Sequence, residues 1–334
     1  MPLVQARGLA KAFGGKPAVV DLSFDVVPGA VTGFLGPNGA GKSTTMRLML
    51  GLDNGAGVTT FDGTRYRDLR EPLRHVGTVL DAKPFHPTRS ARDHLRMIAV
   101  SNKIPTTRVD QVLDLVGLAQ VARAKPKTYS LGMGQRLGLA AALLGDPGTL
   151  ILDEPANGLD PQGVHWLRSM LRTLAAQGRS VFVSSHLLAE MALMADHLVV
   201  LGRGRLIGAG PLQGFIAASS HSAVVARVDR PAALAEAARA AGGEARAEAD
   251  GSLAITGLAL ERVSDLVFDL RLRVLELTRR QPTLEEAFLE ATGASEEFRA
   301  SMGLAAGPPV GPPPAVAPPP GPPPVDGPPT GGPR

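Results

Sequence analysis

Several kinds of residue and segment are scarce in this chain, and each absence excludes a class of function. There is no cysteine among the 334 residues, which excludes disulfides, thiolate metal sites and cysteine nucleophiles. No apolar run reaches the roughly 18 residues that a membrane helix needs, since Asp146-Pro147 interrupts the most apolar stretch. Met1 to Arg7 lack the apolar core of a signal peptide. We therefore expect neither a membrane span nor export by these signals.

Aromatic residues and blocks of one charge are also scarce. Only 4% of the residues are aromatic, so leucine, valine and alanine must fill the cores that an apolar fraction of 44% allows. The net charge of +4 comes from scattered arginines rather than from a Lys/Arg block, and we expect no nucleic-acid partner. The length suffices for one α/β domain and a smaller unit.

The strongest motif in the chain is a glycine-rich loop that matches G-x-x-x-x-G-K-[ST]. An apolar run at 30–35 precedes it and a helix-forming run at 45–50 follows, as the motif requires. Backbone N–H groups of such a loop surround an anion, and the helix N-terminus adds partial positive charge. The expected nucleotide-binding residues are Gly36, Pro37, Asn38, Gly39, Ala40, Gly41, Lys42, Ser43 and Thr44. Lys42 should reach the β- and γ-phosphates, and the Ser43 hydroxyl should ligate Mg²⁺.

A second apolar strand, at 149–152, ends in two acids. Asp153 at such a strand end is expected to hold Mg²⁺ through its waters, and Glu154 is placed to polarise an attacking water as general base. A further buried strand at 180–185 ends at His186. Histidines after strands are commonly structural, but this strand should lie beside that of Asp153, which favours a position facing the γ-phosphate. Lys42, Glu154 and His186 are the catalytic candidates.

Other polar positions stand at the ends of predicted elements. The strand at 76–81 ends on Asp81, and Ser130 opens a helix behind a glycine-containing loop that suits an anion. Asp160 is a predicted N-cap, with proline at the first helical position. Phe13 either stacks on an adenine or covers a sheet edge, and the residues alone leave both open.

Changes in pattern divide the chain into three parts. Residues 1–215 form the nucleotide-binding domain, with a helical insert at about 84–130. Residues 216–293 read as β-α-β-β-α-β with a closing amphipathic helix, a small α+β accessory domain without recognisable chemistry. Residues 294–334 should be a disordered tail, because 14 of the 29 prolines lie at 307–334 among glycine and alanine.

Taken in this order, the motifs of residues 3–215 resemble those of the ATP-binding subunit of an ATP-binding cassette (ABC) transporter. The matching segments are Walker A at Gly36 to Ser43, Walker B at Leu150 to Glu154, the signature at Ser130 to Gly134, the D-loop at Gly158 to Pro161, the switch histidine His186 and the adenine-stacking aromatic at Phe13. The signature and a C-terminal Thr283 to Phe288 segment resemble the antibiotic and multidrug exporter branch. The resemblance implies an α/β P-loop NTPase fold with an antiparallel β subdomain and a helical insert.

Two departures from the family pattern bear on turnover. Asp81 stands where the family usually has the glutamine of the Q-loop; a carboxylate can ligate Mg²⁺ or its water but adds negative charge beside the triphosphate. Leu131 and Met133 replace glycine and glutamine of the usual L-S-G-G-Q signature. Ser130 and Gly132 remain as donors to the γ-phosphate, so reduced hydrolysis is expected rather than none.

The resemblance also implies partners and a mechanism. Two chains, expected to be a homodimer, would hold two ATP molecules with Mg²⁺ head to tail, Walker A of one chain facing the signature of the other. Docked on a separately encoded permease at the cytoplasmic face of the cell membrane, they would energise export of a drug, antibiotic or lipid-like molecule. An ATPase acting on nucleic acid or ribosomes is disfavoured by the single cassette and the lack of heptads. A nucleotide sensor without turnover, suggested by Asp81 and the altered signature, is the other alternative.

Overall fold

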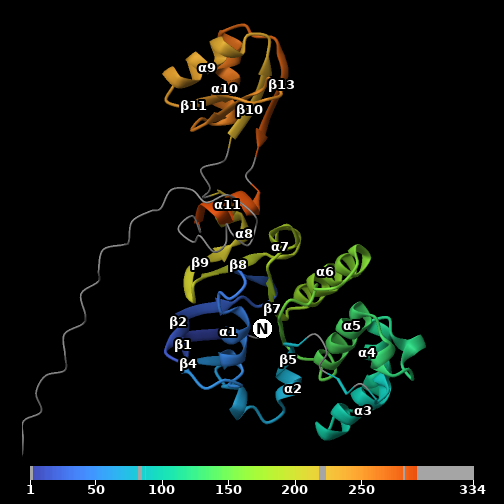
Figure 1. Cartoon of the computed structure of the whole chain (residues 1–334). Helices are drawn as coiled ribbons and strands as arrows, with labels where there is room; N and C mark the ends of the chain where they lie inside the picture. Colours follow the sequence, from blue (N-terminus) through green and yellow to red (C-terminus); the bar gives the residue numbers. More distant parts are fainter. Residues whose placement is uncertain (1–2, 82–84, 87, 218–222, 281–282, 292–334) are drawn as a thin grey trace, which may run out of the picture.

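The protein consists of a larger α/β domain, here called the ATPase domain after the family that its motifs resemble, and a smaller accessory domain, shown in a computed structural model (Figure 1). The structure describes all residues except 1–2, 82–84, 87, 218–222, 281–282 and 292–334. The expected proline-rich tail at 294–334 lies outside the described residues. No described helix is both long and apolar enough to cross a membrane.

A six-stranded sheet forms the centre of the ATPase domain. In spatial order its strands are β5 (Val76–Val79), β6 (Thr149–Leu152), β7 (Ser180–Ser185), β3 (Val31–Leu35), β8 (His197–Gly202) and β9 (Arg205–Pro211). All neighbours pair in parallel except β8 and β9, which form an antiparallel hairpin. Every residue of β3, β6 and β7 is buried, as continuous apolar runs in a sheet covered on both faces require.

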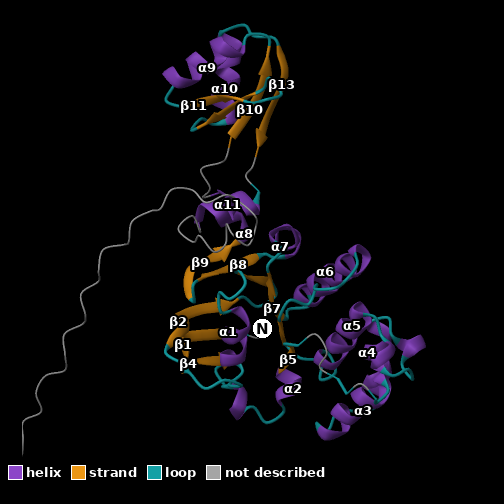
Figure 2. Ribbon diagram, in the orientation of Figure 1, coloured by secondary structure: helices purple, strands orange, loops and turns teal. Residues whose placement is uncertain are grey.

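Helices and a second sheet cover the two faces of this central sheet (Figure 2). Helix α1 (Lys42–Met49) shares a core with the antiparallel sheet of β2 (Lys16–Val26), β1 (Val4–Phe13) and β4 (Ala56–Phe61). Three of the few aromatics stack in that core, since the ring centroids of Phe24, Phe34 and Phe182 lie 4.9 to 5.9 Å apart. The expected antiparallel β subdomain is thereby confirmed.

The opposite face carries the helical insert and the helices that follow it. Its elements are α2 (Pro72–His75), α3 (Ala91–Ser101), α4 (Thr107–Leu115), α5 (Leu131–Ala142), α6 (Pro161–Ala176), α7 (Leu188–Met194) and α8 (Leu212–Ala217), with short 3₁₀ turns η2 (Ala119–Val121) and η3 (Pro126–Thr128). A further 3₁₀ turn, η1 (Tyr66–Asp68), instead packs against β4 in the core of the antiparallel sheet. Ser90 caps α3, its hydroxyl accepting from the N–H of Asp93 at 3.1 Å.

The accessory domain has the predicted β-α-β-β-α-β order. Its elements are β10 (Ala223–Val228), α9 (Pro231–Ala240), β11 (Glu244–Ala247), β12 (Leu253–Thr256), α10 (Leu260–Asp269) and β13 (Val274–Arg280). The strands pair antiparallel in the order β11-β12-β10-β13, and the two helices share an apolar core with them.

The last helix, α11 (Leu284–Ala291), returns to the ATPase domain. We predicted it as the end of the accessory unit at 216–293, but Leu284 and Phe288 belong to the core beneath α7 and α8. The physical reason is that an amphipathic helix packs wherever a large apolar surface is open to it, which its sequence does not specify.

Candidate functional site

The phosphate-binding loop joins β3 to α1 at the carboxyl end of the central sheet. Two of its glycines are required by close backbone approach: a Cβ on Gly36 would lie 2.7 Å from the carbonyl oxygen of Leu201, and one on Gly41 would lie 2.5 Å from that of Ala18. Gly41 also has φ +102°, a conformation that residues with a Cβ rarely adopt. The loop therefore turns sharply enough to aim its N–H groups outward.

Lys42 lies at the base of this loop with its ammonium buried. Its Nζ donates to the carbonyl oxygens of Gly36 at 2.7 Å and Pro37 at 3.3 Å, and the residue is 7% exposed. The same Nζ lies 3.5 Å from Oε1 of Glu154. The lysine and the acid beyond β6 thus share one site before any phosphate is bound.

Three polar side chains meet where β6 and β7 end. Glu154 Oε2 lies 2.6 Å from Nδ1 of His186, which joins the predicted general base to the predicted switch histidine. Ser184 donates to Oδ1 of Asp153 at 2.5 Å and accepts from the backbone N–H of Glu154 at 2.8 Å. Glu154 itself has φ +49°, in the left-handed region that is uncommon for a residue with a Cβ. Its backbone is thereby turned out of the strand direction.

Lys42, Glu154 and His186 line an open cleft of about 450 Å³, whereas Asp153 and Ser184 are not among its lining residues. The lining residues are Phe13, Ala18, Pro37, Asn38, Gly39, Gly41, Lys42, Ser43, Thr44, Glu154, Asn157 and His186. Gly36 and Ala40, also predicted as nucleotide contacts, are buried and are not among the lining residues. Such a volume suits a nucleotide-sized ligand.

Two residues of the cleft were missed from the sequence. Ala18 lines it from β2, and only the fold brings that strand beside the phosphate loop. Asn157 lines it from the turn between Glu154 and the next helix. Its position three residues after Glu154, in the turn that follows the two acids, is the signal in the sequence that could have found it.

Phe13 is at the mouth of the cleft, at the end of β1. The residue is 53% exposed, and Lys11 Nζ lies 5.0 Å from its ring centroid. An exposed aromatic beside a phosphate-binding loop favours the adenine-stacking alternative over the covering of a sheet edge.

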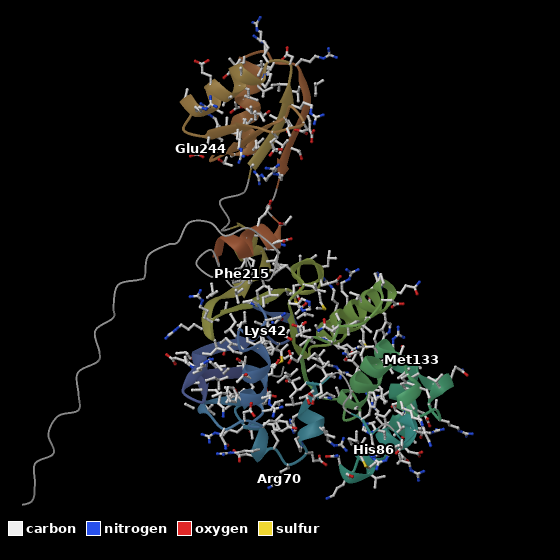
Figure 3. The ribbon with its side chains drawn as sticks, in the orientation of Figure 1. Lys42, Arg70, His86, Met133, Phe215 and Glu244 are labelled. Atoms are coloured by element: carbon white, nitrogen blue, oxygen red, sulfur yellow. The ribbon has the colours of Figure 1, made fainter. Side chains whose placement is uncertain are left out.

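Ser130, Gly132 and Asp160 do not line this cleft. Ser130 caps α5 by accepting from the N–H of Met133 at 3.2 Å, and Asp160 caps α6 by accepting from that of Gly163 at 2.8 Å. Figure 3 labels Lys42 in the middle of the domain and Met133 on a separate helix. The predicted signature and phosphate loop are therefore apart within one chain.

The predicted Mg²⁺ ligands, Ser43, Asp81 and Asp153, carry oxygen donors, the kind of donor that Mg²⁺ prefers. The described residues contain no cluster of three His, Cys, Asp or Glu side chains suited to a metal. A hydroxyl on Ser43 and a carboxylate on Asp153 fit Mg²⁺ all the same, because this ion takes few protein ligands and completes its shell with phosphates and water. Asp81 is exposed. The pKa of Arg47 on α1 is raised mainly by the hydrogen bond and the charge of Asp53, and the charge of Asp81 adds to this shift.

Comparison with family models and sequences gives consistent matches. The model of a family described as ABC transporter matches residues 19–157, and that of a domain of unknown function (DUF8746) matches residues 222–285. The ABC transporter ATP-binding protein YhcH of Bacillus subtilis is 34% identical over 300 residues, covering 88% of this chain and 97% of the relative. The bacitracin transport ATP-binding protein BcrA of Bacillus licheniformis is 36% identical, covering 61% and 68%. The Nod factor export ATP-binding protein I of Burkholderia lata is 38% identical, covering 62% and 70%.

Solved structures agree with these matches. One described as an ATP-binding subunit of an ABC transporter is 27% identical, with a TM-score of 0.59 over 64% of this chain and 91% of its own. That of cbiO1 from Clostridium perfringens is 26% identical, with a TM-score of 0.57 over 64% and 90%. From the phosphate-binding loop, the acids beside it and a relative similar over 88% of the chain, we conclude that this protein belongs to the ABC transporter ATP-binding proteins and hydrolyses ATP.

Proposed function

We propose that this ATPase energises the export of a small molecule through a separately encoded membrane permease. The observation that carries the ATPase chemistry is the contact of Lys42 and His186 with the two carboxylate oxygens of Glu154. The direction of transport is inferred from the relative whose name states Nod factor export, and two other relatives are named for the transport of bacitracin and of a lantibiotic. The substrate would be a drug, an antibiotic or a lipid-like molecule.

The residues of the cleft would divide the work as follows. The loop from Gly36 to Thr44 binds the phosphates, and Phe13 stacks on the adenine. Glu154 accepts the proton of the attacking water, while His186, in contact with the other side of that carboxylate, orients it. Ser43, Asp153 and the exposed Asp81 would hold Mg²⁺, which when bound supplies positive charge to the β- and γ-phosphates.

A second copy of the chain would complete each site. Ser130, Gly132 and Asp160 lie outside the cleft of their own chain, so a head-to-tail dimer can bring them to the partner's nucleotide. The hydroxyl of Ser130 and the N-terminus of α5 would then share the charge of the γ-phosphate. ATP would hold the dimer closed, and its hydrolysis would release it.

The experiment for this scheme is Glu154→Gln, which keeps the shape of the side chain but removes the base. With ATP and Mg²⁺, the variant should hydrolyse little and accumulate as a dimer in size-exclusion chromatography. Glu236→Gln, on an exposed face of α9, should behave like the wild type. If Glu154→Gln turns over ATP at the wild-type rate, or stays monomeric with ATP and the permease present, the scheme fails.

The permease would place the protein at the cytoplasmic face of the cell membrane. No helix in the described part of the chain is long and apolar enough to cross a membrane, and in this scheme the permease supplies the attachment. Co-expression with the permease should move the chain to the membrane fraction, and vesicles that contain the permease should stimulate its ATPase activity. A chain that stays in the soluble fraction beside a correctly inserted permease would contradict this partner.

A further inference from the structure

Ser184 lies between the two acids of the site although nothing in the family comparison or the motifs points to it. Residues 152 and 183 are paired in the β6–β7 ladder, so Asp153 and Ser184 lie side by side just beyond it. Ser184 is 0% exposed. The side chain therefore acts inside the protein and does not touch the nucleotide.

Its one hydroxyl makes two contacts of different kinds. As donor it reaches Oδ1 of Asp153 at 2.5 Å, and as acceptor it takes the N–H of Glu154 at 2.8 Å. A serine hydroxyl has a single proton to donate, and here that proton is committed to the carboxylate. This contact fixes the rotation of the Asp153 carboxylate about its bond to Cβ.

The second contact concerns the backbone of the proposed base. Glu154 adopts φ +49°, which is unfavourable for a residue with a Cβ and persists only where neighbours determine it. The N–H that Ser184 accepts belongs to this residue. With that conformation, the carboxylate reaches both His186 and Lys42.

Neighbouring groups do not duplicate this role. His186 contacts only the far end of the Glu154 side chain. The adjacent Ser185 points its hydroxyl to the N–H of Leu187, at 2.9 Å. Among the described residues, Ser184 is thus the side chain whose hydrogen bonds join Asp153 to the backbone of Glu154.

We propose that Ser184 is a positioning residue for ATP hydrolysis, setting the Asp153 carboxylate for Mg²⁺ and the Glu154 backbone for the attacking water. The inference rests on the roles proposed above for those two acids. Groups that orient a metal ligand in this way are worth about 10- to 100-fold in metal affinity or activity.

The test compares Ser184→Ala with Ser184→Thr, which keeps a hydroxyl and suits a strand. Ser184→Ala should lower kcat by about 10- to 100-fold and raise the Mg²⁺ concentration needed to tighten binding of a fluorescent, non-hydrolysable ATP analogue. Its affinity for the analogue without Mg²⁺ should equal that of the wild type. Ser184→Thr should retain most of both properties.

Thr32→Val is the matched control. Thr32 is a buried residue of β3 whose hydroxyl has no hydrogen-bond partner among the described residues. Removing this hydroxyl should therefore change neither kcat nor the Mg²⁺ dependence of analogue binding. Thermal melting of each variant verifies that it is folded.

Two outcomes overturn the proposal. One is a Ser184→Ala protein with wild-type kcat and Mg²⁺ dependence. The other is a loss of Mg²⁺-free affinity that matches the loss with Mg²⁺, since this would make the serine a support of the fold only. Failure of the underlying ATPase scheme would show separately, as undiminished turnover in Glu154→Gln.

Discussion

Among single residues, the site depends on one ammonium that the fold orients before nucleotide arrives. Two loop carbonyls and Glu154 surround Lys42 Nζ, so little side-chain freedom remains to be lost on binding. Lys42→Ala should weaken ATP binding roughly 10- to 100-fold, as expected from the ~1.5–3 kcal/mol of a hydrogen bond to a charged group. Isothermal titration measures this. Arg262→Ala removes a charge from an exposed position on α10 and should have no effect; unaltered affinity in Lys42→Ala would contradict the site.

Leu131, one of the residues by which the signature departs from the family pattern, leaves no room for a side chain on Gly158. A Cβ on Gly158, at φ +77°, would come within 2.0 Å of Leu131 Cδ2. Gly158→Ala should therefore destabilise the protein by about 1–3 kcal/mol through overpacking, with further strain from the backbone conformation. Urea unfolding measures the change, and adding Leu131→Ala should recover the packing part. If the double variant is as unstable as the sum of the singles, the two residues are not coupled.

At the scale of elements, α3 contains a histidine that ties the stability of the insert to pH. Burial, then the charges of Arg89 and His86, lower the pKa of His94, whose Nδ1 has no partner among the described residues. Since the unfolded chain keeps the ordinary pKa of about 6.5, both states are neutral above it and stability there is independent of this group. Below about pH 6.5 the histidine of the unfolded chain takes up a proton before that of the folded chain does, so the free energy of unfolding decreases as the pH is lowered.

His94→Leu should abolish this dependence. The melting temperature of the wild type should decrease from pH 7 to pH 5 by more than that of the variant, while His165→Gln, on the exposed face of α6, should follow the wild type. Equal slopes in wild type and His94→Leu would show that protonation of His94 does not affect the fold.

The elements themselves were predictable because each has a local signal. Apolar runs predicted β3, β6 and β7, and the N-cap Asp160 predicted the start of α6, where its side chain accepts from the backbone N–H of Gly163. The phosphate loop and the acids of the strand end were found in the same way, since backbone geometry and chemistry coincide in a short segment.

What the sequence could not show depends on contacts between distant segments. Ser184 is one serine in a strand until β6 places Asp153 and Glu154 beside it. Ala18 reaches the cleft only because the antiparallel sheet packs over the phosphate loop. The choice of partner by α11 is decided by which apolar surface remains open after the two domains have formed.

In the whole molecule, the chain leaves the ATPase domain after α8 and returns to it with α11. The accessory domain is thus inserted between two helices that pack on each other and share the core of the ATPase domain. The capping box of Thr283 and Glu286, in which each side chain bonds the other's N–H, starts α11 at the point of return. The ATPase domain is therefore completed by residues that follow the accessory domain in sequence.

This arrangement predicts that a substitution in α11 destabilises the ATPase domain. Leu284 is 3% exposed in its core, so Leu284→Ala should lower the free energy of unfolding by about 2–5 kcal/mol. The only tryptophan, Trp166 on α6, reports that unfolding by its fluorescence without signal from the accessory domain. Leu275→Ala, at a 62% exposed position of β13, should leave the Trp166 transition unchanged. A Leu284→Ala protein with the wild-type transition would instead place α11 with the accessory unit, as its sequence position suggested.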